Sequence, residues 1–116
     1  MNIEDLRDYC MSKKAATESF PFDETTLVFK VMNKMFAVTD IEDELMVVIK
    51  CDPEEFMDMR EHYSAVTQPS HFRGSWNKIG IDGSIDVKLI KEWIDKSYDL
   101  VVSGLTKKDQ RVLEEL

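Results

Sequence analysis

The chain has few of the residues that build metal centres and disulfide scaffolds. Its 116 residues include two cysteines and two histidines. Cys10 and Cys51 form no CxxC pair, neither lies within three residues of a histidine, and His62 and His71 fit no HxxxH or HExxH pattern. The ligand spacings of common zinc sites are therefore absent. We expect two reduced, partly buried thiols, no bound metal and no cofactor.

Glycine and proline are also scarce, with four and three residues. The sequence contains no GxGxxG, no GxxxxGKS/T and no GxSxG, which excludes the familiar dinucleotide, P-loop and nucleophile-elbow motifs. The paired acids Glu54-Glu55 and Glu114-Glu115 lie at a predicted helix start and at the end of the sequence, where capping and solvation explain them. We therefore expect a binding protein and not an enzyme.

Long hydrophobic runs are absent, and basic residues are outnumbered. No stretch approaches the ~18 apolar residues of a membrane span, and acids occupy the positions where a signal peptide carries its basic stretch. These features predict a cytoplasmic protein with no membrane partner. The 23 Asp and Glu residues exceed the 15 Lys and Arg residues, giving a net charge of −8. Because this charge repels polyanions, DNA or another polyanion must be bound by a local patch.

Hydrophobic spacing and capping residues predict alternating groups of helices and strands. Asn2, Asp52, Asp86 and Thr106 are placed to begin four helices, and Pro21 confines the first strand to a sheet edge. The predicted helices cover residues 3–13, 53–63, 86–103 and 106–116. The predicted strands cover residues 17–22, 27–32, 35–39, 45–49, 66–68 and 76–82.

This order of elements, α-β(3–4)-α-β2-α-α, favours an α+β fold with two layers, in which helices cover an antiparallel sheet. The chain contains no internal repeat and no linker rich in glycine, proline or serine. We therefore expect residues 1–116 to form a single domain.

Five short stretches of the sequence, in this order, resemble the MmcQ/YjbR-like proteins. They are residues 19–22 (SFPF), 26–31 (TLVFKV), 34–37 (KMFA), 50–54 (KCDPE) and 94–102 (IDKSYDLVV). The resemblance covers nearly the whole chain. It implies an antiparallel α+β fold that has been described as a double-wing motif, a predicted role in binding DNA, and no catalytic residues. The sequence departs from the family pattern at residues 71–77 (HFRGSWN), where Ser75 takes the place of a second histidine.

Two segments without acids indicate where a polyanion would bind. Residues 26–39 and 64–81 contain no Asp or Glu, whereas they contain Lys30, Lys34, Arg73 and Lys78. Strands are poor in acids in any case, so this pattern is also typical of ordinary hairpins. If the positive charges gather on one surface, they favour phosphate binding.

Strand alternation adds an aromatic residue to this surface. If Ile79 and Ile81 face the core, Trp76 and Lys78 share the outer face, where an indole ring stacks on a base. Alternatively, Trp76 lies under the last helix and His71 is merely solvated. The resulting hypothesis is weak nucleic-acid binding by Lys30, Lys34, His71, Arg73, Trp76, Asn77 and Lys78.

A protein-interaction domain is the alternative function. The sequence has seven methionines, including Met32, Met35, Met46, Met57 and Met59, and flexible thioethers suit an adaptable apolar contact. A partner segment would then bind at this surface or at a sheet edge. Polyanion binding falls steeply with salt, whereas binding of an apolar segment does not.

Overall fold

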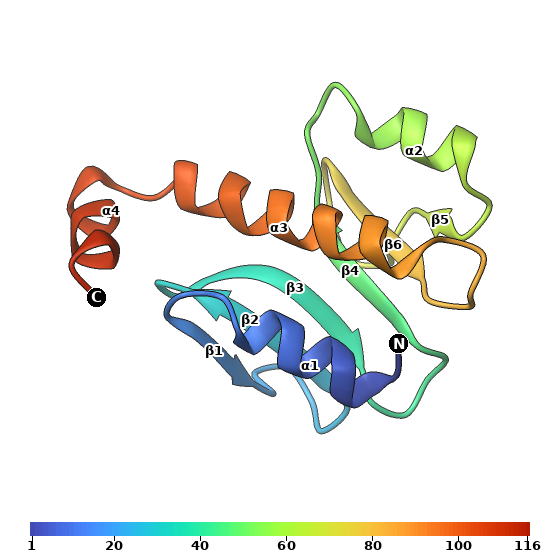
Figure 1. Cartoon of the computed structure of the whole chain (residues 1–116), viewed down its shortest axis with the longest axis horizontal. Helices are drawn as coiled ribbons and strands as arrows, with labels where there is room; N and C mark the ends of the chain where they lie inside the picture. Colours follow the sequence, from blue (N-terminus) through green and yellow to red (C-terminus); the bar gives the residue numbers. More distant parts are fainter.

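A computed structural model describes residues 1–116 and contains one six-stranded antiparallel sheet with four helices (Figure 1). The strands follow the order β1-β2-β3-β4-β6-β5 across the sheet. The helices are α1 (Ile3–Met11), α2 (Phe56–His62), α3 (Val87–Ser103) and α4 (Lys107–Glu114). The strands are β1 (Ala16–Ser19), β2 (Thr26–Val31), β3 (Lys34–Asp40), β4 (Met46–Lys50), β5 (Val66–Thr67) and β6 (Trp76–Gly80). The predicted α+β class and element order are confirmed.

The helices gather on one face of the sheet and build the main core with it. The long helix α3 packs on β3 and β4, α1 packs against β1, and α2 packs on β5 and β6 (Figure 1). Fully buried side chains such as Leu6, Phe29, Ile79, Ile90 and Ile94 fill the space between the two layers. Burial of this apolar surface is the main force that holds the layers together.

Three of the four predicted helix starts are confirmed by their caps. Asn2 and Asp5 form a reciprocal capping box, the Asp86 carboxylate accepts from the backbone N–H of Lys88, and the Thr106 hydroxyl accepts from that of Asp109. Each cap satisfies an N–H group that the helix leaves unpaired.

The predicted start of the second helix was wrong. The segment from Asp52 to Glu55 forms a turn, and α2 begins only at Phe56. The Asp52 carboxylate accepts from the backbone N–H of Glu54 at 2.8 Å, while its carbonyl accepts from those of Glu55 and Phe56. Asp52 therefore closes a local turn, as aspartate often does, and the helical geometry begins one turn later.

The hairpin formed by β2 and β3 turns at two residues in the left-handed region. Met32 and Asn33 have φ angles of 48° and 66°, which is the conformation of a two-residue hairpin turn that follows the twist of the strands. In β3, Ala37 pairs with Phe29 and Met35 pairs with Lys30, so Phe36 is an extra residue. This bulge lets Phe36 and Ala37 both enter the core.

A buried serine links the helical layer to the centre of the sheet. The Ser97 hydroxyl on α3 donates to the carbonyl of Phe36 at 2.6 Å and accepts from the backbone N–H of Lys50 at 2.9 Å. Ser97 has no exposed surface. One side chain therefore satisfies two backbone groups, on β3 and β4, and fixes the position of α3 over them.

Replacing Ser97 by alanine should destabilise the fold without changing it. The variant Ser97→Ala leaves a buried carbonyl and a buried N–H without their partner, which costs about 1–3 kcal/mol for an unsatisfied group. Urea denaturation measures this loss. The control Ser103→Ala removes an exposed hydroxyl that bonds only to Leu100 within the same helix, and it should change stability much less. Equal stabilities of the two variants would contradict the role of Ser97.

Candidate functional site

The face of the sheet opposite the helices carries a second, smaller apolar cluster. Val28, Val38 and Val48, on three neighbouring strands, pack together and are at most 3% exposed. Around them lie the partly buried side chains Met35, Met46, Phe72 and Trp76. This open face, defined as the sheet surface around the three valines, is therefore covered by side chains and loops instead of a helix.

A groove with a volume of about 810 Å³ crosses the open face. Its floor includes Val38, Val48, Met35 and Met46. The loop between β1 and β2 and the loop between β5 and β6 supply further lining residues. From the first loop come Phe22 and Asp23, and from the second Pro69, Ser70, His71, Phe72 and Arg73. The volume falls within the range of about 300–1,000 Å³ that is usual for ligand sites.

Aromatic side chains lie on both sides of the groove. Phe72 packs against Trp76 with ring centroids 5.2 Å apart at 49°. Phe22 comes from the loop beside β2, which two strands, β3 and β4, separate from β6, and it is 65% exposed. An exposed aromatic ring and a nearby aromatic pair, all in contact with one groove, form the kind of surface on which a flat ligand stacks.

The charges in the groove are separated along the strands. Trp76 pairs with Lys50 at one end of the ladder between β4 and β6, and Met46 pairs with Gly80 at the other. Arg73 lies in the loop that leads into the Trp76 end, and Lys78 lies in the middle of β6. The salt bridges of the chain join Arg7 to Glu18 and Lys13 to Asp95, so neither Arg73 nor Lys78 takes part in one. Both cations are therefore available to a ligand.

The other end of the groove is acidic. Asp40 ends β3 beside Met46, and Asp23 lies in the loop that leads into β2. Both carboxylates already accept hydrogen bonds from neighbouring loop residues: Asp23 from Thr25 and Thr26, and Asp40 from the N–H of Glu42 at 2.9 Å. The N–H and hydroxyl of Thr26 lower the pKa of Asp23. The two acids therefore hold the loops in shape. Their negative charge also marks where the cationic half of the groove ends.

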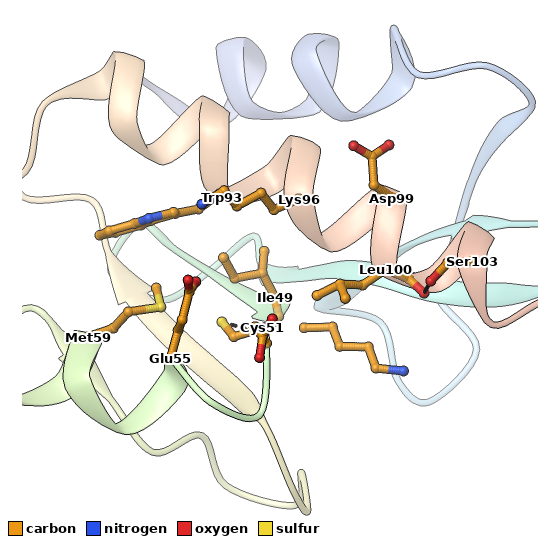
Figure 2. Close-up of a pocket in the computed structure, with 11 residues that line it drawn as sticks. Ile49, Cys51, Glu55, Met59, Trp93, Lys96, Asp99, Leu100 and Ser103 are labelled. Atoms are coloured by element: carbon orange, nitrogen blue, oxygen red, sulfur yellow. Dashed lines mark hydrogen bonds between the residues drawn. The ribbon is translucent and has the colours of Figure 1, made fainter.

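A second hollow, of about 320 Å³, lies on the helical side between the end of β4, α2 and α3 (Figure 2). Figure 2 shows Ile49, Met59, Trp93 and Leu100 around it, with Glu55 directed toward Trp93. Charged groups of both signs border it, so it has no electrostatic preference for one class of ligand. The groove on the open face is larger and separates its charges, and for this reason it is the better candidate site.

Cys51 lines the second hollow but does not have the properties of a nucleophile. Burial raises the pKa of its thiol to about 11, although the nearby Asn77 lowers it in part. Burial also raises the pKa of Cys10 to about 12. A thiol reacts as its thiolate, and both groups are protonated at neutral pH. The two cysteines are free in the structure, as the sequence predicted.

A family model called YjbR matches residues 11–100 of the chain. The chain belongs to the YjbR family. Over 118 aligned residues it is 30% identical to the uncharacterised protein YjbR of Escherichia coli K12, with both chains covered completely. It is also 27% identical over 94 residues to the uncharacterised protein YbdF of Escherichia coli O157:H7, covering 79% of this chain and 77% of that protein. The resemblance seen in the sequence is therefore confirmed.

Solved structures agree with this family assignment. The crystal structure of a Deinococcus radiodurans protein with a DUF419 domain is similar at a TM-score of 0.88 and 34% identity, over 97% of this chain and 88% of that one. A Pseudomonas syringae protein has the same fold, with a TM-score of 0.71 at 20% identity over 86% of this chain and 98% of that one. These matches establish the YjbR fold, and the relatives' names assign no activity.

The structure brings four of the predicted site residues together. His71, Arg73, Trp76 and Lys78 all line the groove. Lys30 alternates with the core residues Phe29 and Val31, so it lies on the open face, beside Met35. The alternation argument for Trp76 and Lys78 was correct, and Trp76 does not lie beneath the last helix.

Asn77 is a correction, because it lies on the other face of the sheet. It has no exposed surface. Its side-chain oxygen accepts from Nε of Arg60 at 2.8 Å, and its nitrogen donates to the carbonyl of Phe56 at 2.9 Å. These bonds attach α2 to β6. Asn77 is therefore a structural residue and is not available to a ligand on the open face.

Lys34 is a second correction. It pairs with Val31 at the tip of the hairpin between β2 and β3. Paired residues point to the same side of a sheet, and Val31 belongs to the main core. Lys34 therefore extends from the helical side, away from the other candidate cations, and does not contribute to the groove.

Sequence reasoning missed the aromatic residues Phe22 and Phe72. Both lie in loops, and their meeting with Trp76 at one groove depends on how the loops fold back over the sheet. One signal in the sequence points to Phe22. It ends a Phe-Pro-Phe stretch, and the residues that follow it are polar. Exposed aromatic residues in such a loop are candidates for binding.

No group of three or more histidine, cysteine, aspartate and glutamate side chains is arranged to hold a metal ion. None of the helices combines the length and the apolar character required to cross a membrane.

The buried thiols give the protein a testable dependence on pH. Their ordinary pKa of 9.0 is raised in the folded state to about 11 for Cys51 and about 12 for Cys10. The folded state therefore favours the protonated thiols, and this stabilisation is complete below about pH 9 and lost as the pH rises toward 11–12. Urea denaturation between neutral pH and pH 11 should show the decline.

The variant Cys51→Ala is the matched comparison for this effect. Because it lacks one of the two thiols, its stability should decline less steeply above pH 9. The native protein should also react with a disulfide reagent at neutral pH far more slowly than the unfolded chain. Rapid labelling of Cys51 in the native state would show that its thiol is not protected.

Proposed function

We propose that the chain is a non-enzymatic binding domain that holds nucleic acid weakly on its open face. The observation that carries the proposal is the groove itself, which combines the Phe72–Trp76 pair with Arg73 and Lys78 above an apolar floor. Bases stack on aromatic rings, and guanidinium and ammonium groups bind phosphates by donating hydrogen bonds to them. Nucleic acid presents bases and phosphates together and can use both kinds of group in one groove.

The number of cations limits the strength of binding. Arg73 and Lys78 lie in the groove, and Lys30 lies nearby on the same face. Three phosphate contacts release counterions with a slope of log affinity against log salt of about −2 for a single strand and about −3 for a duplex. The net charge of −8 opposes binding as well. Binding should therefore be measurable at low salt and weak at physiological salt.

A protein segment is the competing ligand for the same groove. Met35 and Met46 contribute to its floor, and methionine side chains adapt to apolar partners. The charge separation favours a polyanion, because an apolar segment has no need of the unpaired Arg73 and Lys78. Salt distinguishes the two cases: binding of an apolar segment should change little between about 50 and 200 mM salt.

Reversing the two groove cations together should abolish binding. We expect the double variant Arg73→Glu, Lys78→Glu to lose retention on immobilised heparin and DNA at low salt. The fold should be retained, because neither side chain makes a salt bridge and Arg73 is exposed, and only a small fall in melting temperature is expected from placing an acid at the half-buried Lys78. Column elution and thermal unfolding measure the two properties.

The matched control makes the same change of charge elsewhere. Lys107 and Lys108 are exposed at the start of α4, and the double variant Lys107→Glu, Lys108→Glu has the same net charge as the groove variant. It should elute like the original protein if the groove binds the polyanion. Equal retention of the two double variants would show that the groove is not the surface that binds the polyanion.

A further inference from the structure

We infer that the groove on the open face takes an unpaired nucleic-acid strand in preference to a duplex. This inference rests on the proposed function and makes it more specific. Its basis is the combination of an apolar floor, aromatic residues on two sides, and charges that change sign along the groove, with Arg73 at the Trp76 end, Lys78 in the middle and two carboxylates at the other end.

The floor of the groove is suited to bases and not to phosphates. Met35 and Met46 are partly exposed above the buried Val38 and Val48 and offer apolar contact, and Trp76 and Phe72 offer ring faces. In a duplex the bases are stacked and paired inside, and the outer surface presents phosphates and sugars. Only an unpaired strand can turn its bases toward such a floor, as occurs on the sheets of proteins that bind single-stranded RNA.

Aromatic groups lie on both sides of the groove, where an unpaired base can stack on them. Phe22 comes from the β1 side of the sheet and the Phe72–Trp76 pair from the β6 side, with β3 and β4 between them. Phe22 is the more exposed of the two phenylalanines in its loop, at 65% against 46% for Phe20. More of its ring surface is therefore free for a base to cover.

The acidic end of the groove opposes a second strand. Asp40 and Asp23 lie at the end where β6 finishes at Gly80, and β6 is about 13 Å long at ~3.3 Å per residue. The opposite strand of a duplex lies about 6–12 Å away across a groove. With one backbone held by Arg73 and Lys78, the phosphates of the other strand would approach the two carboxylates. A single strand has no second backbone and is flexible, so it can leave the groove before the acidic end and avoid this repulsion.

The test compares one DNA sequence in two forms. A fluorescein-labelled single-stranded oligonucleotide and the same sequence closed into a blunt hairpin duplex are titrated with the protein at about 50 mM salt, and anisotropy reports binding. We expect the single strand to bind at least tenfold more tightly. The groove variant Arg73→Glu, Lys78→Glu should weaken binding of both forms.

A pair of phenylalanine variants tests the role of stacking. Phe22→Ala should weaken single-strand binding by about fivefold to a hundredfold, which is the usual effect of removing one stacking ring. Phe20→Ala is the control, because Phe20 lies in the same loop but borders a different hollow, beside α1. It should leave binding unchanged. Phe22 is exposed, so its loss should not impair folding, which thermal unfolding verifies.

The possible results separate this inference from the function on which it rests. If duplex and single strand bind equally well and both depend on Arg73 and Lys78, the open face binds nucleic acid but the preference is wrong. If Phe22→Ala and Phe20→Ala bind the single strand alike, stacking at Phe22 is wrong. If neither form binds the original protein at low salt, both the inference and the proposed function fail.

Discussion

The ladder between β4 and β6 is the interaction on which the rest of the structure depends. It joins Met46–Lys50 to Trp76–Gly80 through five residue pairs, and it connects the hairpin strands to the short strand β5 at the far edge. The register of this ladder places Ile79 in the main core and Lys78 opposite Val48 on the open face. A shift of one residue would exchange the two faces, burying the lysine and exposing the isoleucine. Core burial therefore fixes the register, and the register fixes the candidate site.

Both faces of the sheet carry apolar side chains, but helices cover only one of them. The helical face is closed by α3 and by the bonds of Ser97, while Asn77 attaches α2 to the same side. On the open face, three valines are covered by methionines, aromatic residues and a loop. In the proposed function, a ligand packs on the methionines and aromatic rings that cover the valines and are themselves only partly buried.

Local sequence rules predicted most of the elements, because the forces behind them are local. The caps at Asn2 and Thr106 and the alternation around Ile79 depend on residues only a few positions apart. The start of α2 was misplaced because Asp52 can cap a helix or close a turn, and the sequence does not distinguish the two. Asn77 was wrongly assigned to the ligand surface although the alternation that placed Trp76 outside also places Asn77 inside. For Lys34, the direction is set by the pairing at the hairpin tip and by the bulge at Phe36.

The amino-acid sequence by itself determined the α+β class, the order of elements, the family and the free state of the thiols, since each follows from spacing, composition or short motifs. Only the tertiary structure decided that Phe22 and Phe72 meet the Trp76 region at one groove, and that Asp23 and Asp40 limit it. These residues lie up to 54 positions apart in the sequence. Their proximity results from two loops folding over a sheet whose strand order is not sequential, and no local propensity encodes that arrangement.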